Sequence, residues 1–241
     1  MKIFRKTRQK FIIDKKITNY ILYAIGEVFL VMTGILLALY VSNWNDVRMQ
    51  RNELTGILKT IALDLERDTL VGSGLIKFYT ENEKISLKII NKEISFENYK
   101  DCPSCTSLVS IYKPFNIQTK GYDLVKNFSN QNNQKNDTLV TNITQFYTSL
   151  SELIKDSNKF IKDEVFSNIN SFKEHSWFID WTQGNYSKEM IIYFTESEDY
   201  RKRVASHNLL AAKNHLLFIT IYNNGAKAIL KKINERFKNE L

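Results

Sequence analysis

The sequence predicts a mainly α-helical protein, with one N-terminal transmembrane helix continuing into an exported antiparallel helical bundle. Residues 20–41 form one long apolar run. Later segments repeat apolar residues at alternating spacings of three and four, which is the period of a helix with one buried face. The chain of 241 residues contains two prolines, which leaves room for long helices.

Composition and charge exclude several classes of protein. With 43% hydrophobic and 25% charged residues, the chain can bury a core and is not disordered throughout. The net charge of +8 is concentrated in residues 1–19, where seven Lys or Arg residues accompany one Asp. A basic tail beside an apolar run is typical of a membrane anchor. We therefore expect residues 1–19 to be a cytoplasmic tail, and we expect no nucleic-acid partner.

Residues 20–42 are the expected transmembrane helix. About 20 apolar residues in a helix span the hydrocarbon core of a bilayer. Aromatic residues at both ends suit the headgroup layer; they are Tyr20, Tyr23, Tyr40 and Trp44. The alternative is a cleavable signal peptide, whose apolar core has about 7–15 residues and ends at a small-x-small site. The longer run, and the absence of such a site in Ala38–Ser42, favour an uncleaved anchor.

Positive charge before the span predicts its orientation, because Lys and Arg are retained on the cytoplasmic side. Residues 43–241 would then be exported, which in a Gram-negative cell means a periplasmic domain anchored to the inner membrane. Cys102 and Cys105 suit that compartment, because two thiols three positions apart can form a disulfide where oxidants persist. A redox-active pair, free thiols or half of a metal site are the alternatives. A redox pair usually begins a helix after a strand, and that context is not predicted here.

The first 50 residues resemble a known family. The motifs that carry the resemblance are the basic start FRKTRQK at residues 4–10, AIGE at 24–27, GILLAL at 34–39 and NWND at 43–46. They are similar to a family of uncharacterised bacterial single-span membrane proteins of the Bacteroidota type, with AIGE, GILIAL and NNWN signatures. Residues 122–124 and 139–147 are more loosely similar to it. The family has no assigned activity, so the resemblance implies the topology alone.

The exported part should begin with a helix over residues 44–91. Its apolar stripe starts at Leu54 and Leu58, and the glycines of residues 71–74 predict a kink or break. Residues 92–120 contain both prolines and lack a sustained period, which predicts a connecting loop with a short strand at 107–112. The polar tract 127–137 is typical of a turn, with Asn136 or Asp137 as the N-cap of the next helix.

Two further helices are expected near residues 138–166 and 198–238, on either side of an aromatic cluster at 177–181. The last helix has nine positions at strict three-four spacing: Leu209, Ala212, Leu216, Ile219, Asn223, Ala226, Leu230, Ile233 and Phe237. Asn223 is the polar member of this seam, where a buried Asn can determine register or oligomeric state. Because Asn223-Asn224-Gly225 is also a turn signal, a helix–turn–helix break there is the alternative.

The span contains two candidate functional features. Gly26, Gly34 and Ala38 recur along one face, and small residues four apart let membrane helices approach closely. Glu27 is the single ionisable residue inside the run, where a charge is costly unless it is paired, protonated or near the interface. Glu27 either carries a proton or binds a polar group of another helix, or it reaches the cytoplasmic interface and has no such role.

No catalytic motif stands out, and His175, His207 and His215 lack the spacing of metal ligands on a helix. We therefore expect no enzyme activity, cofactor or bound metal. The function we expect is that of a membrane-anchored periplasmic scaffold or receptor-like subunit, which associates with itself or with another envelope protein. The alternative is an ion-coupling accessory subunit of a membrane channel or motor that uses Glu27. An enzyme with residues assembled from distant positions is the third possibility.

Overall fold

The computed structural model describes residues 17–132 and 137–239, so the basic tail to residue 16 lies outside the described residues. The chain divides into two units, residues 1–55 and 56–241. The described residues form helices, turns and irregular segments without a strand. The mainly α-helical fold class is therefore confirmed, whereas the short strand predicted at residues 107–112 is wrong. Residues 103–110 form consecutive turns instead.

Helix α2, Ile17–Ile90, contains the apolar run. Within the described residues it is the one helix long and apolar enough to cross a membrane, and none of its apolar window is buried by the protein. The hydroxyl of Thr33 donates to the Phe29 carbonyl at 2.8 Å, so this polar side chain is satisfied within the helix. The first unit thus has the composition and helical backbone that a membrane span requires.

The helix break predicted at residues 71–74 is wrong, because α2 continues through these residues to Ile90. Gly72 serves a different purpose. A Cβ atom added there would lie 3.2 Å from Oδ1 of Asn223, so the missing side chain makes room for the last helix. Gly74 faces open space and has no such contact.

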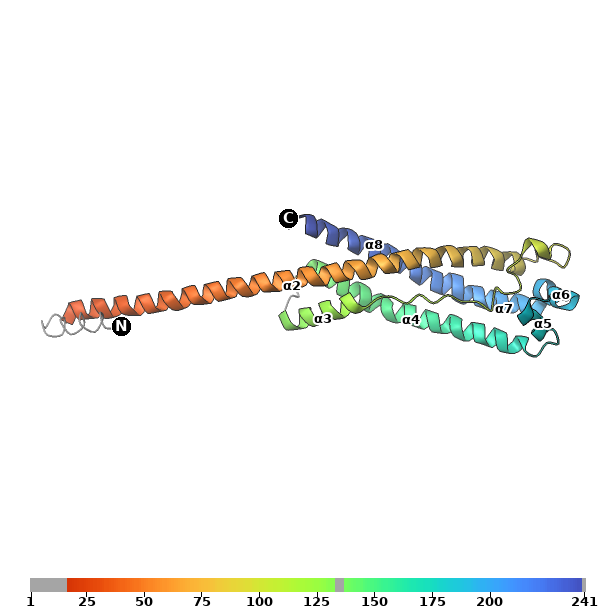
Figure 1. Cartoon of the computed structure of the whole chain (residues 1–241), viewed down its shortest axis with the longest axis horizontal. Coiled ribbons are helices and arrows are strands. Elements are labelled where there is room, and N and C mark those ends of the chain that lie inside the picture. Colours follow the sequence, from red (N-terminus) through yellow and green to blue (C-terminus); the bar gives the residue numbers. More distant parts are fainter. Residues whose placement is uncertain (1–16, 133–136, 240–241) are drawn as a thin grey trace. The chain divides into compact units, whose positions relative to one another are not determined.

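The second unit contains the remaining helices, of which Figure 1 labels α3 to α8. They are α3 (Lys120–Asn132), α4 (Thr138–Phe172), α5 (Phe178–Gln183), α6 (Lys188–Glu196), α7 (Glu198–Asn208), a π-helical segment (Leu209–His215) and α8 (Leu216–Asn239), together with a 3-10 turn at Tyr99–Asp101. The turn predicted for residues 127–137 is wrong as far as residue 132, where α3 ends. Asp137 is the N-cap of α4, as predicted, since its carboxylate accepts from the N–H groups of Leu139 and Val140.

Side-chain contacts show that the bundle is antiparallel, as predicted. Nζ of Lys213 lies 2.6 Å from the Glu83 carboxylate, and Nδ2 of Asn223 donates to Ser73 Oγ at 3.3 Å. Residue numbers therefore rise along the C-terminal helix in the direction in which they fall along α2, so the two helices are antiparallel. The Ser157–His215 hydrogen bond and the ring contact of Tyr147 with Tyr222 give the same relation between α4 and α8.

The π-helical segment changes the register of the predicted C-terminal seam. Buried residues follow a spacing of four three times in succession, at His207, Ala211, His215 and Ile219. A π-helical turn contains more residues than the 3.6 of an α-helical turn, so successive buried residues are further apart in the sequence. Leu209 consequently faces outward with 59% of its surface exposed, so its assignment to the seam is wrong. Asn223 is buried within α8, and the predicted continuous helix is confirmed there.

Candidate functional site

Five of the ten buried polar side chains that the structure describes bind one segment, residues 105–121, which runs beside the helices; they are Asp64, Asp68, Asn168, His207 and His215. Residues 111–119 of this segment have no regular secondary structure. An extended chain cannot form the internal hydrogen bonds of a helix, so its backbone groups need other partners. The neighbouring helices supply them from side chains.

Two of these side chains each pair with both backbone groups of one residue. The Tyr79 hydroxyl accepts from the N–H of Lys113 at 2.9 Å and donates to its carbonyl at 2.8 Å. The Asn158 amide accepts from the N–H of Phe115 and donates to its carbonyl, both at 2.9 Å. Tyr79 and Asn158 therefore bind this segment as a neighbouring β-strand would, through backbone groups alone.

The buried carboxylates of α2 bind the C-terminal end of the segment. Asp68 accepts from the N–H of Gln118 at 3.0 Å and from the hydroxyl of Tyr222 at 2.6 Å. Asp64 accepts from the N–H of Gly121 at 2.7 Å. Burial raises the pKa of Asp68, while the bonds from Tyr222 and Gln118 act in the opposite direction. These carboxylates bind backbone N–H groups at the start of α3.

Two histidines near the π-helical segment lie against the same stretch of backbone. Burial lowers the pKa of His207 and of His215 to about 4, and hydrogen bonding to the backbone of Ile111 and Lys113 acts in the opposite direction. Nδ1 of His215 also lies 2.8 Å from Ser157 Oγ. A Ser–His pair suggests nucleophilic catalysis, but His215 is fully buried and Ser157 nearly so, so a substrate in solution does not reach them.

The spacing of these contacts requires an extended conformation. Asp68 and Tyr79 are eleven residues apart on α2, which is about 16 Å along a helix. Their partners Gln118 and Lys113 are five residues apart, so the segment advances by about 3.3 Å per residue, as a strand does. Residues 111–119 and then α3 thus occupy one position in an antiparallel bundle, the first part as extended chain and the second as helix.

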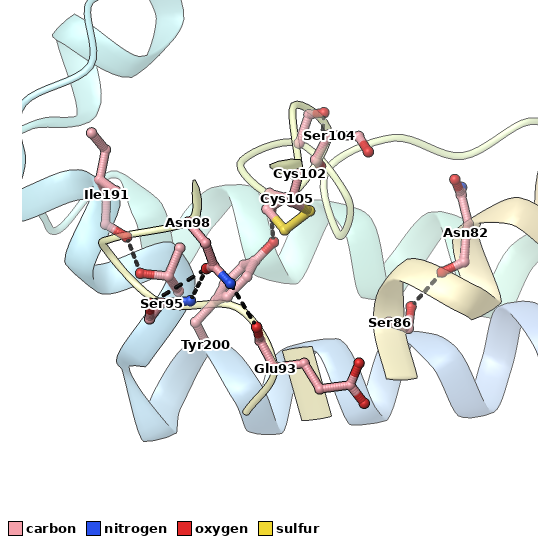
Figure 2. The surroundings of a disulfide bond; sticks show 12 residues. Asn82, Ser86, Glu93, Ser95, Asn98, Cys102, Ser104, Cys105, Ile191 and Tyr200 are labelled. Carbon is pink, nitrogen blue, oxygen red and sulfur yellow. Dashed lines mark hydrogen bonds between the residues drawn. A yellow bond between two sulfur atoms is a disulfide. The ribbon is translucent and has the colours of Figure 1, made fainter. Parts of the chain in front are cut away.

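The segment begins at the predicted disulfide, which joins Cys102 to Cys105 with Cα atoms 5.4 Å apart. Both cysteines are buried, and the hydroxyl of Tyr200 donates to the Cys105 carbonyl (Figure 2). The bridge forms part of a core with the aromatic cluster predicted around Trp177; its aromatic members include Phe172, Trp177, Phe194 and Tyr200. The disulfide lies inside this core and is not displayed to solvent.

Asn223 lies opposite Gly72, outside the set of contacts to the segment. Its Nδ2 group donates to Ser73, whereas its buried Oδ1 accepts no hydrogen bond from any described residue. The structure thus brings Asn223 to α2.

The candidate residues of the span all lie on α2 in the first unit. Gly26 and Gly34 have open space where a side chain would extend, and Glu27 is exposed on the same helix. Their roles in association or ion coupling remain predictions.

The remaining histidine, His175, stacks on the ring of Trp177 at 4.6 Å. Across the residues that the structure describes, no group of three or more His, Cys, Asp and Glu side chains is arranged to hold a metal ion. Sequence reasoning missed Asp64, Asp68, Tyr79 and Asn158 as a group. The available signal was their occurrence at or beside buried positions of predicted helices, where isolated polar residues need partners.

Comparison with family models, with curated proteins and with solved structures finds no match to this chain.

Proposed function

We propose that the protein is a membrane-anchored scaffold or receptor-like subunit whose exported unit binds another envelope protein. One observation carries the proposal. Asp68, Tyr79 and the Ser157–His215 pair are buried, and Asp68 and Tyr79 hold the protein's own backbone. Such an interior supports a binding or structural role and leaves the surface available for a partner.

The apolar helix supports the anchoring part of the proposal. In this arrangement residues 20–42 span the inner membrane, the N-terminus is cytoplasmic and the second unit is periplasmic. The disulfide is consistent with an oxidising compartment. The face with Gly26, Gly34 and Ala38 would pair the span with a second copy or with a partner helix.

Co-purification tests the binding role. The full chain is extracted in mild detergent after crosslinking in intact cells, and the proteins that remain bound are identified. A control carries the span and tail with the second unit deleted. A partner retained by the full chain and lost from the control supports the proposal. Recovery of the same proteins with both forms assigns binding to the span instead and contradicts the role of the exported unit.

Topology is tested separately with a membrane-impermeant thiol reagent. Lys173 is exposed on the second unit, so Lys173→Cys in a chain lacking Cys102 and Cys105 provides an accessible thiol. Labelling once the outer membrane is opened is the expected result. Labelling that requires lysis of the inner membrane would reverse the orientation.

The second candidate function is ion coupling, which the position of an ionisable Glu27 within the apolar run favours. Replacing Glu27 with Gln preserves polarity and removes the titratable group. A scaffold should retain its partner in the Glu27→Gln variant, whereas an ion-coupling subunit should lose its activity while still assembling.

A further inference from the structure

Residues 111–119, called the strap below, are bound to the bundle mainly through their backbone. Phe115 is the single buried residue of the nine, and its ring packs edge-on against Tyr222 at 5.2 Å. The other side chains of the strap are exposed or half-buried. The strap therefore contributes one large side chain to the core, together with the hydrogen bonds of its backbone.

The groups that hold the strap recognise an extended chain of almost any sequence. Tyr79 and Asn158 each bind the N–H and carbonyl of one residue, and Asp68 binds one N–H further along. Backbone hydrogen bonds of this kind provide affinity in strand-like peptide recognition, and a pocket for a single side chain provides specificity. Here the pocket is the site of Phe115.

Space remains on the α4 side of the strap. A surface pocket lies beside the stretch that follows Phe115; the α4 residues lining it are Ser151, Glu152, Ile154, Lys155 and Asn158. The strap is consequently less tightly enclosed than the helices around it. A segment with few buried apolar contacts opens at a lower free energy than the global unfolding of the domain.

We propose that the groove between α2, α4 and α8 is a binding site for an extended peptide that carries one large apolar side chain, and that the strap occupies this site as an autoinhibitory contact. The ligand is a segment of a partner protein, so the inference rests on the proposed binding function and names the class of partner. Displacement of the strap exchanges one set of backbone hydrogen bonds for an equivalent set, and the incoming side chain takes the place of the Phe115 ring.

A peptide can bind only those molecules in which the strap is released. The apparent affinity is therefore the intrinsic affinity multiplied by the released fraction. Phe115→Ala removes the one anchoring side chain and should raise that fraction. The probe is a fluorescein-labelled peptide with the sequence of residues 109–119, VSIYKPFNIQT, added to the full-length protein in detergent. Fluorescence anisotropy measures its binding.

We expect the Phe115→Ala chain to bind the probe at least about tenfold more tightly than the wild type. Adding Asn158→Ala should abolish this gain, because two backbone hydrogen bonds are lost. A peptide with alanine in place of its phenylalanine should not bind. Phe160→Ala is the matched control, since Phe160 is exposed on α4 and should leave binding at the wild-type level. Circular dichroism checks the helices, and Phe115→Leu replaces Phe115→Ala if helicity is lost.

Equal binding of the probe by the wild-type and Phe115→Ala chains would overturn the proposal. A second result would also overturn it. If the amides of Lys113 and Phe115 exchange hydrogen only when the whole bundle unfolds, the strap is a permanent part of the core. The partner assay separates this inference from the proposed function. A partner kept by Asn158→Ala contradicts the groove and leaves the scaffold role standing. If no partner co-purifies, that role fails, and the peptide measurement still decides the groove.

Discussion

Asn158 on α4 forms two hydrogen bonds with Phe115, one to its N–H and one to its carbonyl, both 2.9 Å long. An amide side chain here replaces the neighbouring strand that an extended segment would have in a sheet. Asp68 and Tyr79 on α2 are buried and bind the backbone of the same segment. The pair of Asn158 and Phe115 gives the first of five predictions.

Replacing Asn158 with Leu should destabilise the second unit by about 2 kcal/mol, because two backbone groups lose partners at about 1 kcal/mol each. Asn170→Leu on the exposed side of α4 is the control and should change stability by less than about 0.5 kcal/mol. Chemical denaturation in detergent measures both. Equal stability of the two variants would show that water replaces Asn158 at no cost.

Stability should fall as the pH decreases below about 6.5. Burial lowers the pKa of His207 and His215 from 6.5 to about 4, so the unfolded chain binds protons at a pH where the folded chain does not. The stabilisation is present above the unfolded pKa and is lost as the pH falls toward 4, with a slope of up to about 1.4 kcal/mol per pH unit for each histidine. Denaturation between pH 7 and pH 5 measures this slope.

His207→Gln and His215→Gln should each reduce the slope, even if they also lower stability at pH 7. The burial of Asp68 works in the opposite sense, because its raised pKa lets the folded chain bind a proton first as the pH falls. A slope that the two histidine variants leave unchanged would assign the acid sensitivity to other groups.

Replacing Gly121 or Gly74 with alanine should change the stability of the second unit in opposite directions. A Cβ atom at Gly121 would lie 2.8 Å from the Ile61 backbone, so Gly121→Ala must displace α3 from α2 and should cost more than about 2 kcal/mol. Gly74 lies on the exposed face of α2 with nothing within 4 Å, so Gly74→Ala should stabilise by about 1 kcal/mol. Thermal unfolding of the two variants gives the comparison, and a stabilising Gly121→Ala would contradict the close contact.

Asn223→Leu should raise the melting temperature of the second unit. The buried Oδ1 of Asn223 accepts no hydrogen bond from the described residues, and such a group costs about 1–3 kcal/mol. The weak bond to Ser73 is the loss that opposes this gain. If the amide determines register or oligomeric state, the same variant should broaden the distribution of crosslinked species. A lower melting temperature would mean that a bound water satisfies Oδ1.

Gly34→Ile and Ala38→Ile should weaken association of the span while leaving membrane insertion intact. Both substitutions keep the run apolar and add bulk to the face expected to approach another helix. Crosslinking yield in membranes is the measurement, and Leu36→Ile on the opposite face is the control. Unchanged yields in both variants would exclude this face as the contact.

Much of the fold could be predicted from the sequence because helical periodicity is local. The three-four spacing located α4 and the C-terminal helix, and it placed Asn223 on a buried face. The N-cap at Asp137 was recognisable because capping involves a few neighbouring residues. The cysteine spacing allowed a disulfide, which the structure contains.

Other expectations failed where a distant contact outweighed the local signal. Gly72 suggested a break in α2, but it accommodates a side chain about 150 positions away in the sequence. The π-helical turns that rotate Leu209 outward pack against α4, and the apolar spacing alone did not indicate them.

The helical class, the apolar run of α2 and the places where helices could begin follow from local patterns, because each depends on residues within a few turns of one another. The roles of the polar residues inside the bundle depend on long-range packing. Asp68, Tyr79 and Asn158 lie on two helices far apart in sequence, and each has a common role in an amphipathic helix when considered alone. Their shared function appears once an extended segment lies between them, because its backbone groups require partners that no local pattern specifies.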